Sequence, residues 1–152
     1  MNLTTKIPPP AVAITAGLVM WGIAYFAPRL SLSSDIRLAL TMIIALMGLA
    51  ISVSGAMSFR QLGTTLNPTK PEEASALVTT GIYQVTRNPM YLGLLVVLVA
   101  WSIFLSSAWA LLGVLGFVLY MTRFQIAEEE RVLTRLFGSD YESYKARVRR
   151  WL

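Results

Sequence analysis

The sequence predicts an all-α fold, a polytopic membrane helical bundle of about four transmembrane helices with a cytosolic loop and an amphipathic C-terminal helix. Three observations predict it. First, 55% of the 152 residues are hydrophobic and 14% are charged, against about 25% charged in soluble domains. Second, uncharged residues form runs long enough to cross a bilayer. Third, nearly all the positive charges fall on one predicted side of the membrane.

Four uncharged segments are predicted to span the membrane, because a bilayer core needs about 20 apolar residues in a helix. Residues 10–28 and 38–59 give the first two spans. The uncharged stretch Asn88–Thr122 would make one helix of roughly 50 Å against a core of about 30 Å. We therefore divide it into spans at residues 89–105 and 108–122. Small residues on the second span would let another helix approach closely; they are Ala45, Gly48, Ser52, Gly55 and Ala56.

The segments between and after the spans are polar. Residues 60–91 form a long loop rich in Gly and Pro, and loops of this length in a small protein are commonly functional. After the fourth span, apolar residues at helical spacing predict an amphipathic cytosolic helix over residues 124–138, which Gly138 would end. No repeat or second domain is evident, so residues 1–152 are predicted to form a single domain.

Lysine and arginine are distributed unevenly within a net charge of +5. With four spans, the N-terminus, the middle loop and the C-terminal tail share one side, which holds all these cations except Arg29 and Arg37. Because Lys and Arg are retained on the cytoplasmic side, both termini and the functional site are predicted to be cytoplasmic, in a protein of the inner cell membrane.

Two absent residue types narrow the possible chemistry. The chain contains no cysteine and no histidine, which removes thiolate chemistry, the commonest general base and the commonest metal ligand. Acid–base or charge chemistry therefore falls to Asp, Glu, Lys, Arg or Tyr, and no metal site is predicted. Membrane lipids are the expected partners, and no nucleic acid is expected.

Two charged segments border the third and fourth spans. Arg87 precedes Asn88 and Pro89, which suit the N-cap and the first position of a helix. Arg87 either reaches to lipid phosphates or joins the helix N-terminus as an anion site for a carboxylate. Glu128–Glu130 follow the fourth span and form either a solvated acidic face or a site for a cationic ligand. An anion site and a cation site on one face suggest a ligand that carries both charges.

Two motifs in these segments carry a resemblance to a known family. The first comprises Gly63-Thr64, Asn67-Pro68, Leu77-Val78-Thr79-Thr80-Gly81-Ile82-Tyr83 and Arg87-Asn88-Pro89-Met90-Tyr91-Leu92-Gly93. The second comprises Glu129-Glu130, Leu133, Phe137-Gly138, Tyr141, Tyr144 and Arg150. Together they resemble the isoprenylcysteine carboxyl methyltransferase family, which also takes in phospholipid methyltransferases. The resemblance covers roughly residues 60–152, with the motifs in the family's order around two spans.

The resemblance implies an S-adenosylmethionine-dependent methyltransferase that acts on a lipophilic acceptor, a small molecule or a lipid, entering from the bilayer. It places the cofactor on the cytosolic side, without a soluble-type Rossmann fold. Arg87 is the candidate for the cofactor's carboxylate, and Glu129 and Glu130 are candidates for its ammonium or sulfonium or for the acceptor; these three are the expected catalytic residues. The expected cofactor-binding residues are Leu77, Val78, Gly81, Tyr83, Arg87, Asn88, Pro89, Tyr91 and Glu129.

One departure and several alternatives stay open. Many family members have His where this chain has Asn88, and Asn cannot titrate. A carboxylate acceptor needs no general base, whereas an amine or thiol needs one, and Glu129 or Glu130 is the available choice. One alternative is an NADPH-dependent membrane sterol-type reductase, which carries a similar Arg-x-Pro-x-Tyr element but a different tail. The other is a non-enzymatic membrane scaffold protein.

Overall fold

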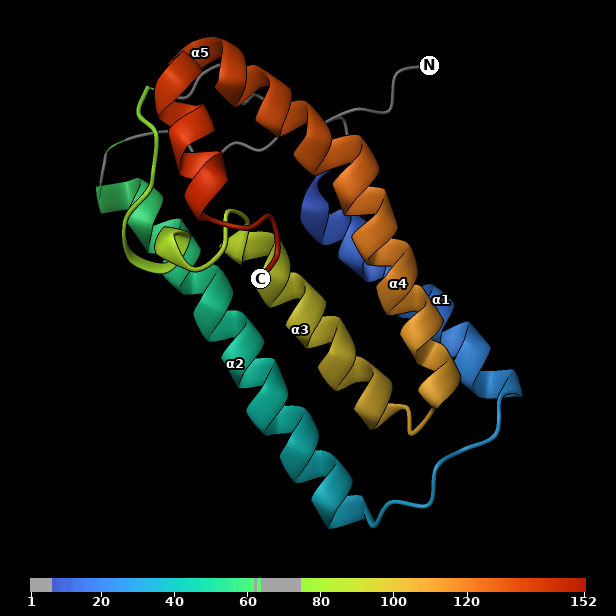
Figure 1. The fold of residues 1–152 in the computed structure, drawn as a ribbon. Coiled ribbons are helices and arrows are strands. Elements are labelled where there is room, and N and C mark those ends of the chain that lie inside the picture. The colour runs from blue at the N-terminus through green and yellow to red at the C-terminus, as the bar shows by residue number, and fades with distance from the viewer. Residues whose placement is uncertain (1–6, 62, 64–74) are drawn as a thin grey trace.

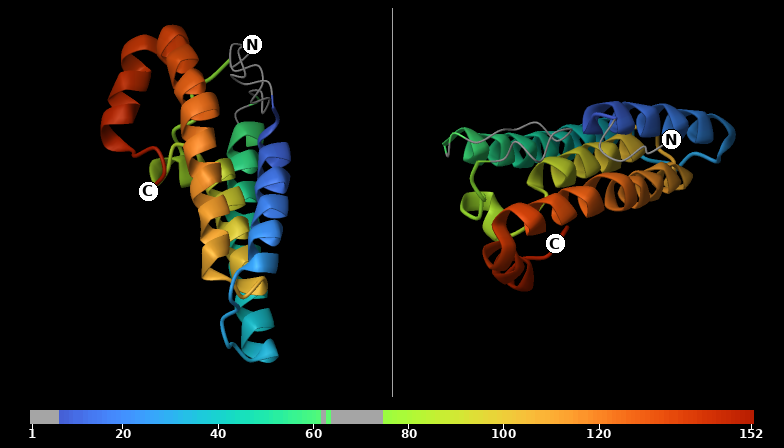
Figure 2. Two further views of the ribbon diagram at one scale, coloured as in Figure 1. Left: turned by 90° about the vertical axis from the view of Figure 1, so that its right-hand side faces the viewer. Right: turned by 90° about the horizontal axis from the view of Figure 1, so that it is seen from above.

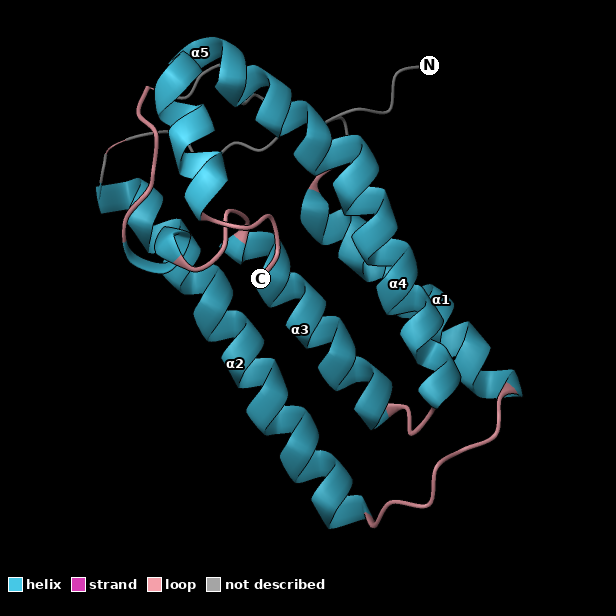
Figure 3. Ribbon diagram, in the orientation of Figure 1, coloured by secondary structure: helices cyan, strands magenta, loops and turns pink. Residues whose placement is uncertain are grey.

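A bundle of helices makes up the computed structural model, which describes residues 7–61, 63 and 75–152 and contains no strand within them (Figures 1 and 3). The all-α fold class is therefore confirmed. The motif residues Thr64, Asn67 and Pro68 lie outside the described residues. The elements are α1 (Pro9–Phe26), α2 (Ser34–Gln61), the turn η2 (Gly81–Gln84), α3 (Pro89–Phe104), the turn η3 (Ala108–Ala110), α4 (Leu111–Tyr120), the π-helical segment η4 (Met121–Ile126) and α5 (Ala127–Arg147).

The helices have the length and surface of membrane spans. Of the described helices, α1, α2 and the rod from Ala108 to Arg147 are long and apolar enough to cross a bilayer, and α3 is a shorter apolar helix. Only 6% of the apolar window of α2 is buried inside the protein, and Leu46, Leu49 and Val53 are each more than half exposed. Such a surface is stable against lipid and costly against water, which agrees with the predicted membrane bundle.

The small residues of α2 bring α3 unusually close. A Cβ added to Gly48 would lie 2.7 Å from the Gly93 carbonyl oxygen, and one added to Gly55 would lie 2.9 Å from Cγ of Pro89. Ser52 Oγ donates a hydrogen bond of 3.1 Å to the Met90 carbonyl. The close approach expected from this stripe is confirmed, and it fixes the start of α3 against α2.

The last helices differ from the sequence prediction. A separate helix was expected over residues 124–138, but α4 runs without a break through the π-helical segment η4 into α5, because no Gly or Pro interrupts the chain there. Gly138 does break the helix, with φ 51° and ψ −123°, a conformation that suits glycine. Beyond it, residues 139–147 are again helical, which the sequence analysis did not anticipate.

The break at Gly138 folds the C-terminal segment back over one end of the bundle (Figures 1 and 2). In the bundle, α1 packs along α4, and α2 packs along α3. The folded-back segment brings the chain's end to the start of α3, where the Arg87 amide donates to the Arg149 carbonyl at 3.1 Å. Three parts of the chain therefore meet at this end: the first turn of α3, the η4–α5 junction and the C-terminal tail.

Candidate active site

The carboxylate of Glu129 lies between α3 and α5. Tyr91, buried in the first turn of α3, donates its hydroxyl hydrogen to Oε1 of Glu129. The Gln125 side chain, one helical turn before Glu129, donates to the same oxygen at 2.7 Å. Among the described residues, no cation forms an ion pair with Glu129.

Burial controls the proton affinity of Glu129. Removal of the carboxylate from water raises its pKa from 4.5 to about 7, and this effect outweighs the hydrogen bonds from Tyr91 and Gln125, which lower it. The residue as a whole keeps some accessible surface, although its carboxylate is enclosed. Glu129 can therefore gain or lose a proton near neutral pH.

Glu130, the next residue, has the opposite surroundings. Arg87 Nη2 lies 3.0 Å from its Oε1. Arg150 donates from Nε to the same oxygen at 2.9 Å and from Nη2 to Oε2 at 2.6 Å. The Glu130 side chain is only 14% exposed. Two guanidinium groups thus neutralise this carboxylate, and the fork of Arg150 holds it in a fixed orientation.

Arg87 keeps hydrogen-bonding capacity that the protein does not use. Its side chain is 10% exposed and forms the ion pair with Glu130. Its Nε and Nη1 atoms are buried and have no hydrogen-bond partner among the described residues. Buried polar groups are nearly always satisfied, and an unsatisfied donor on a cation is especially costly. These two donors are therefore available to an anionic group of a ligand.

The tail is tied to the turn before α3 by its backbone carbonyls. Asn88 Nδ2 donates to the Arg150 carbonyl at 2.8 Å, and Thr86 Oγ1 donates to the same oxygen at 3.4 Å. Asn88 stands at the N-cap position of α3, but its side chain makes no capping bond. Trp151 Nε1 donates to Thr122 Oγ1 at 3.2 Å. Asn88 therefore anchors the tail rather than capping the helix.

A layer of tyrosines borders the charged groups. Val78, Tyr83, Tyr141 and Tyr144 are buried in one cluster, and Leu77 packs against it. The Tyr144 hydroxyl donates to the Tyr83 carbonyl at 2.7 Å. Burial raises the pKa of Tyr83 and Tyr144, and it raises the pKa of Tyr141 to about 12. These hydroxyls stay protonated at neutral pH and act as hydrogen-bond donors.

The structure brings most of the predicted residues to this end of the bundle. Arg87, Tyr91, Glu129 and Glu130 form the charged centre, with Asn88 and the buried Pro89 beside them. Gly81 begins η2 with φ 61°, which places Tyr83 in the tyrosine layer. Glu128 points elsewhere and pairs with Arg131.

Three contributors escaped the sequence analysis as site residues. Gln125 stands four residues before Glu129, a spacing that places both on one helical face, so this signal was present. Arg150 and Tyr141 belong to the second family motif, but no local pattern predicts the chain reversal at Gly138 that brings them to the site. Within the described part of the chain, no group of three His, Cys, Asp or Glu residues is arranged to hold a metal ion.

Comparisons with known proteins place these residues in a wider context. The sequence model described as "Phospholipid methyltransferase" matches residues 36–140. An uncharacterized protein of Haemophilus influenzae is 51% identical over 63 residues, which is 41% of this chain and 100% of that protein. Protein-S-isoprenylcysteine O-methyltransferase B of Arabidopsis thaliana is 34% identical over 88 residues, 56% of this chain and 43% of that protein.

A probable protein-S-isoprenylcysteine O-methyltransferase of Oryza sativa subsp. japonica is 34% identical over 80 residues, 51% of this chain and 40% of that protein. The chain thus spans less than half the length of these plant relatives. No solved structure matches it.

Proposed function

Because the chain belongs to the phospholipid methyltransferase family, we propose that it transfers a methyl group from S-adenosylmethionine to a lipophilic acceptor held in the membrane. The family and the named plant relatives point to a membrane methyltransferase. The proposal adds to this activity the identity of the cofactor and the chemical class of the acceptor. They rest on one observation. At the same end of the bundle, Arg87 has two donor atoms that bond to no described residue, and the carboxylate of Glu129 forms no ion pair with a described cation.

These two groups match the amino-acid end of the proposed cofactor, which carries a carboxylate and an ammonium. Arg87 would bind the carboxylate through Nε and Nη1, because neither atom has a partner in the residues that the structure describes. Glu129 would bind the ammonium or lie near the sulfonium, because no guanidinium neutralises it. Glu130 would hold Arg87 in place, an indirect role set by its contacts with Arg87 and Arg150.

The remaining predicted residues would surround the adenosine end. Leu77, Val78 and Tyr83 belong to the tyrosine layer next to the charged centre. Gly81, Asn88 and Pro89 shape the backbone between that layer and α3. Tyr91 would orient Glu129 through its hydroxyl group.

Methyl transfer requires mainly that the protein align the acceptor with the methyl group. When bound, the cofactor would supply an activated methyl group; the methyl carbon would bond to the acceptor while the carbon–sulfur bond breaks and leaves its electron pair on sulfur. The chain's residues would hold acceptor and methyl about 3 Å apart and shape the local field. A carboxylate acceptor loses no proton, whereas an amine, phenol or thiol loses one. Glu129, with its pKa near 7, is suited to accept that proton.

The charge pattern supports a cytoplasmic site. Seven described cations lie on η4, α5 and the tail, at the same end of the bundle as the candidate site: Arg123, Arg131, Arg135, Lys145, Arg147, Arg149 and Arg150. The opposite end holds Arg29 and Arg37. By the positive-inside rule, the site and both termini would face the cytoplasm, in a protein of the inner membrane.

Calorimetry on the purified protein in detergent tests the cofactor. We expect S-adenosylhomocysteine to bind and NADPH not to bind; the reverse result would favour a reductase and overturn the proposal. Arg87→Ala and Glu129→Ala should each abolish binding while the protein remains folded. Arg131→Ala and Glu128→Ala, which remove the neighbouring pair that faces outward, are the matched controls and should bind like the wild type.

Methyl transfer itself is tested with radiolabelled S-adenosylmethionine and a total lipid extract. Label should enter a lipid-soluble product with wild-type protein and not with Arg87→Ala. Binding of S-adenosylhomocysteine without any transfer would retain the cofactor site and reject a lipid as the acceptor.

A further inference from the structure

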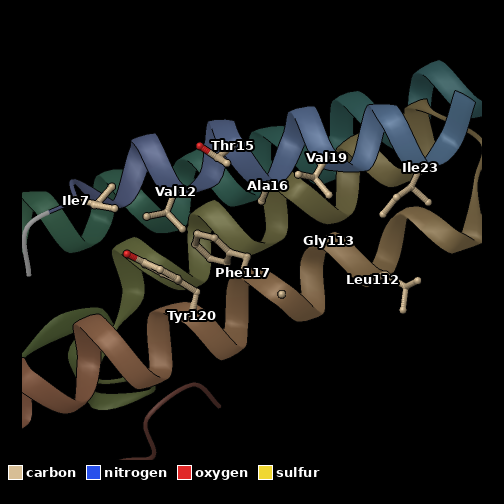
Figure 4. A pocket seen from close by; sticks show the side chains of 11 residues that line it. Ile7, Val12, Thr15, Ala16, Val19, Ile23, Leu112, Gly113, Phe117 and Tyr120 are labelled. Carbon is tan, nitrogen blue, oxygen red and sulfur yellow. The ribbon is translucent and has the colours of Figure 1, made fainter. Parts of the chain in front are cut away.

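A narrow groove lies between α1 and α4, away from the charged centre (Figure 4). Its volume is about 320 Å³. Val12, Ala16 and Val19 line it from α1, and Leu112, Gly116 and Phe117 line it from α4. These residues extend along both helices within the membrane-spanning part of the bundle, so the groove lies at the depth of the bilayer core.

Small residues create this groove. α1 and α4 are in contact at Gly113, where an added Cβ would lie 3.2 Å from Sδ of Met20. Three residues further along α4, a Cβ added to Gly116 would meet no atom within 4 Å. One glycine thus allows the two helices to touch, and the other leaves an apolar space beside the contact.

A single hydroxyl group at one end of the groove has no partner. Tyr120 lines the groove and is the last residue of α4. Its hydroxyl oxygen is buried from solvent and makes no hydrogen bond with the described part of the chain. Figure 4 places it at the same end as Ile7 and Val12. A buried unsatisfied hydroxyl calls for a partner, and an apolar chain ending in an oxygen-bearing group would supply one.

The groove adjoins the hydrophobic core cluster to which Tyr91 of the candidate site belongs. Phe117 lines the groove and packs in the same core cluster as Met121, Ile126 and Tyr91. Tyr120 packs against that cluster as well. Tyr91 in turn donates to Glu129. A chain lying in the groove would therefore end against the core cluster that contains Tyr91.

We propose that this groove binds one hydrocarbon chain of the methyl acceptor, with an oxygen of the acceptor's polar part bonded to the Tyr120 hydroxyl. The inference rests on the proposed function. A volume of about 320 Å³ lies at the lower limit for ligand sites, which suits one chain and not two. A second chain, if the acceptor has one, would stay in the bilayer.

Photolabelling tests the groove independently of catalysis. The probe is palmitic acid with a diazirine in mid-chain, irradiated with the purified full-length protein in detergent, and labelled peptides are mapped by mass spectrometry. We expect labels on the facing sides of α1 and α4. Gly116→Leu should fill the groove and reduce these labels at least fivefold. Gly22→Leu makes the same change in equally open space on α1, outside the groove, and should leave them unchanged.

A second variant tests the polar end. Tyr120→Phe keeps the ring and removes the hydroxyl group, so the probe should bind about three- to tenfold more weakly. Labels spread evenly over α2 and the groove helices, or equal in wild type and Gly116→Leu, would overturn the proposal. Dimers that dissociate in Gly116→Leu would also overturn it, because a second copy of the chain would then occupy the groove.

The transfer assay links the groove to the acceptor. With total lipid extract, Gly116→Leu should lower kcat/KM at least tenfold while its affinity for S-adenosylhomocysteine stays within twofold of wild type. Unchanged transfer by this variant would show that the groove does not hold the acceptor. If the wild type binds no S-adenosylhomocysteine, the proposed function fails. Photolabelling alone then tests whether the groove binds a hydrocarbon chain.

Discussion

The stability of the protein should fall as pH rises from 5 to 7.5, because of Glu129. Its pKa is raised from 4.5 to about 7 by burial, so the folded protein favours the protonated form. Between these two values the unfolded chain has lost this proton and the folded protein has kept it. The free energy of unfolding therefore decreases with rising pH across this window and levels off above pH 7.

The magnitude follows from the size of the pKa change. At about 1.4 kcal/mol per pH unit, the rise of the pKa from 4.5 to about 7 corresponds to at most about 3–4 kcal/mol, an upper limit because the residue keeps some accessible surface. For a protein of this size, 3 kcal/mol lowers the melting temperature by roughly 6–12 °C. Because the chain contains no histidine, no other side chain ordinarily titrates between pH 5 and 7.5.

Thermal unfolding in detergent at closely spaced pH values measures the effect. Glu129→Gln keeps the shape and the hydrogen-bonding capacity of the side chain but cannot ionise, so its melting temperature should stay nearly constant from pH 5 to 7.5. Glu128→Gln, whose parent residue faces outward beside Arg131, should follow the wild type. Identical pH profiles for wild type and Glu129→Gln would refute the assignment of the raised pKa to this carboxyl group.

Three further substitutions test the framework of the site. Gly93→Leu should push α3 away from α2 and lower the free energy of unfolding by about 1–3 kcal/mol, measured by thermal unfolding. The control Gly22→Leu should lower it little, and equal losses in the two variants would contradict the close packing. Arg150→Ala should release the tail from Glu130, so amide hydrogen exchange of the last five residues should accelerate about three- to tenfold. Arg149 is exposed, and the control Arg149→Ala should leave the exchange rates unchanged. Gly138→Ala should cost about 1–3 kcal/mol, because φ 51° with ψ −123° excludes a Cβ; an unchanged melting temperature would contradict that backbone.

Much of the bundle could be predicted from sequence because its signals are local. Uncharged runs locate the helices, since charge in a bilayer core is costly whatever the tertiary structure. The stripe of Gly48, Ser52 and Gly55 indicates where a second helix packs, because only small side chains permit such an approach. Pro89 predicts where α3 begins, because proline suits the first position of a helix, and α3 does begin there.

The site could be predicted only in part because its pairings are distant in sequence. Arg150 reaches Glu130 across the reversal at Gly138, and a glycine that breaks a helix does not reveal whether or where the helix resumes. The π-helical segment Met121–Ile126 also shifts the helical phase by about one residue. Positions on α5 therefore cannot be projected from α4 at 3.6 residues per turn, so the residue that Tyr91 contacts could not be derived.

Glu129 and Glu130 are adjacent and chemically identical, but their side chains point in different directions and meet different partners. Neighbours on a helix point about 100° apart. Glu129 therefore faces Tyr91 on α3, whereas Glu130 faces the tail and the guanidinium of Arg150. From sequence, either carboxylate was a candidate for a cationic ligand or a proton. The contacts favour Glu129 for both tasks, because Glu130 already compensates two guanidiniums and a ligand would have to displace them. The same pairing leaves Nε and Nη1 of Arg87 without a partner among the described residues, so Glu130 would present Arg87 to the proposed anion.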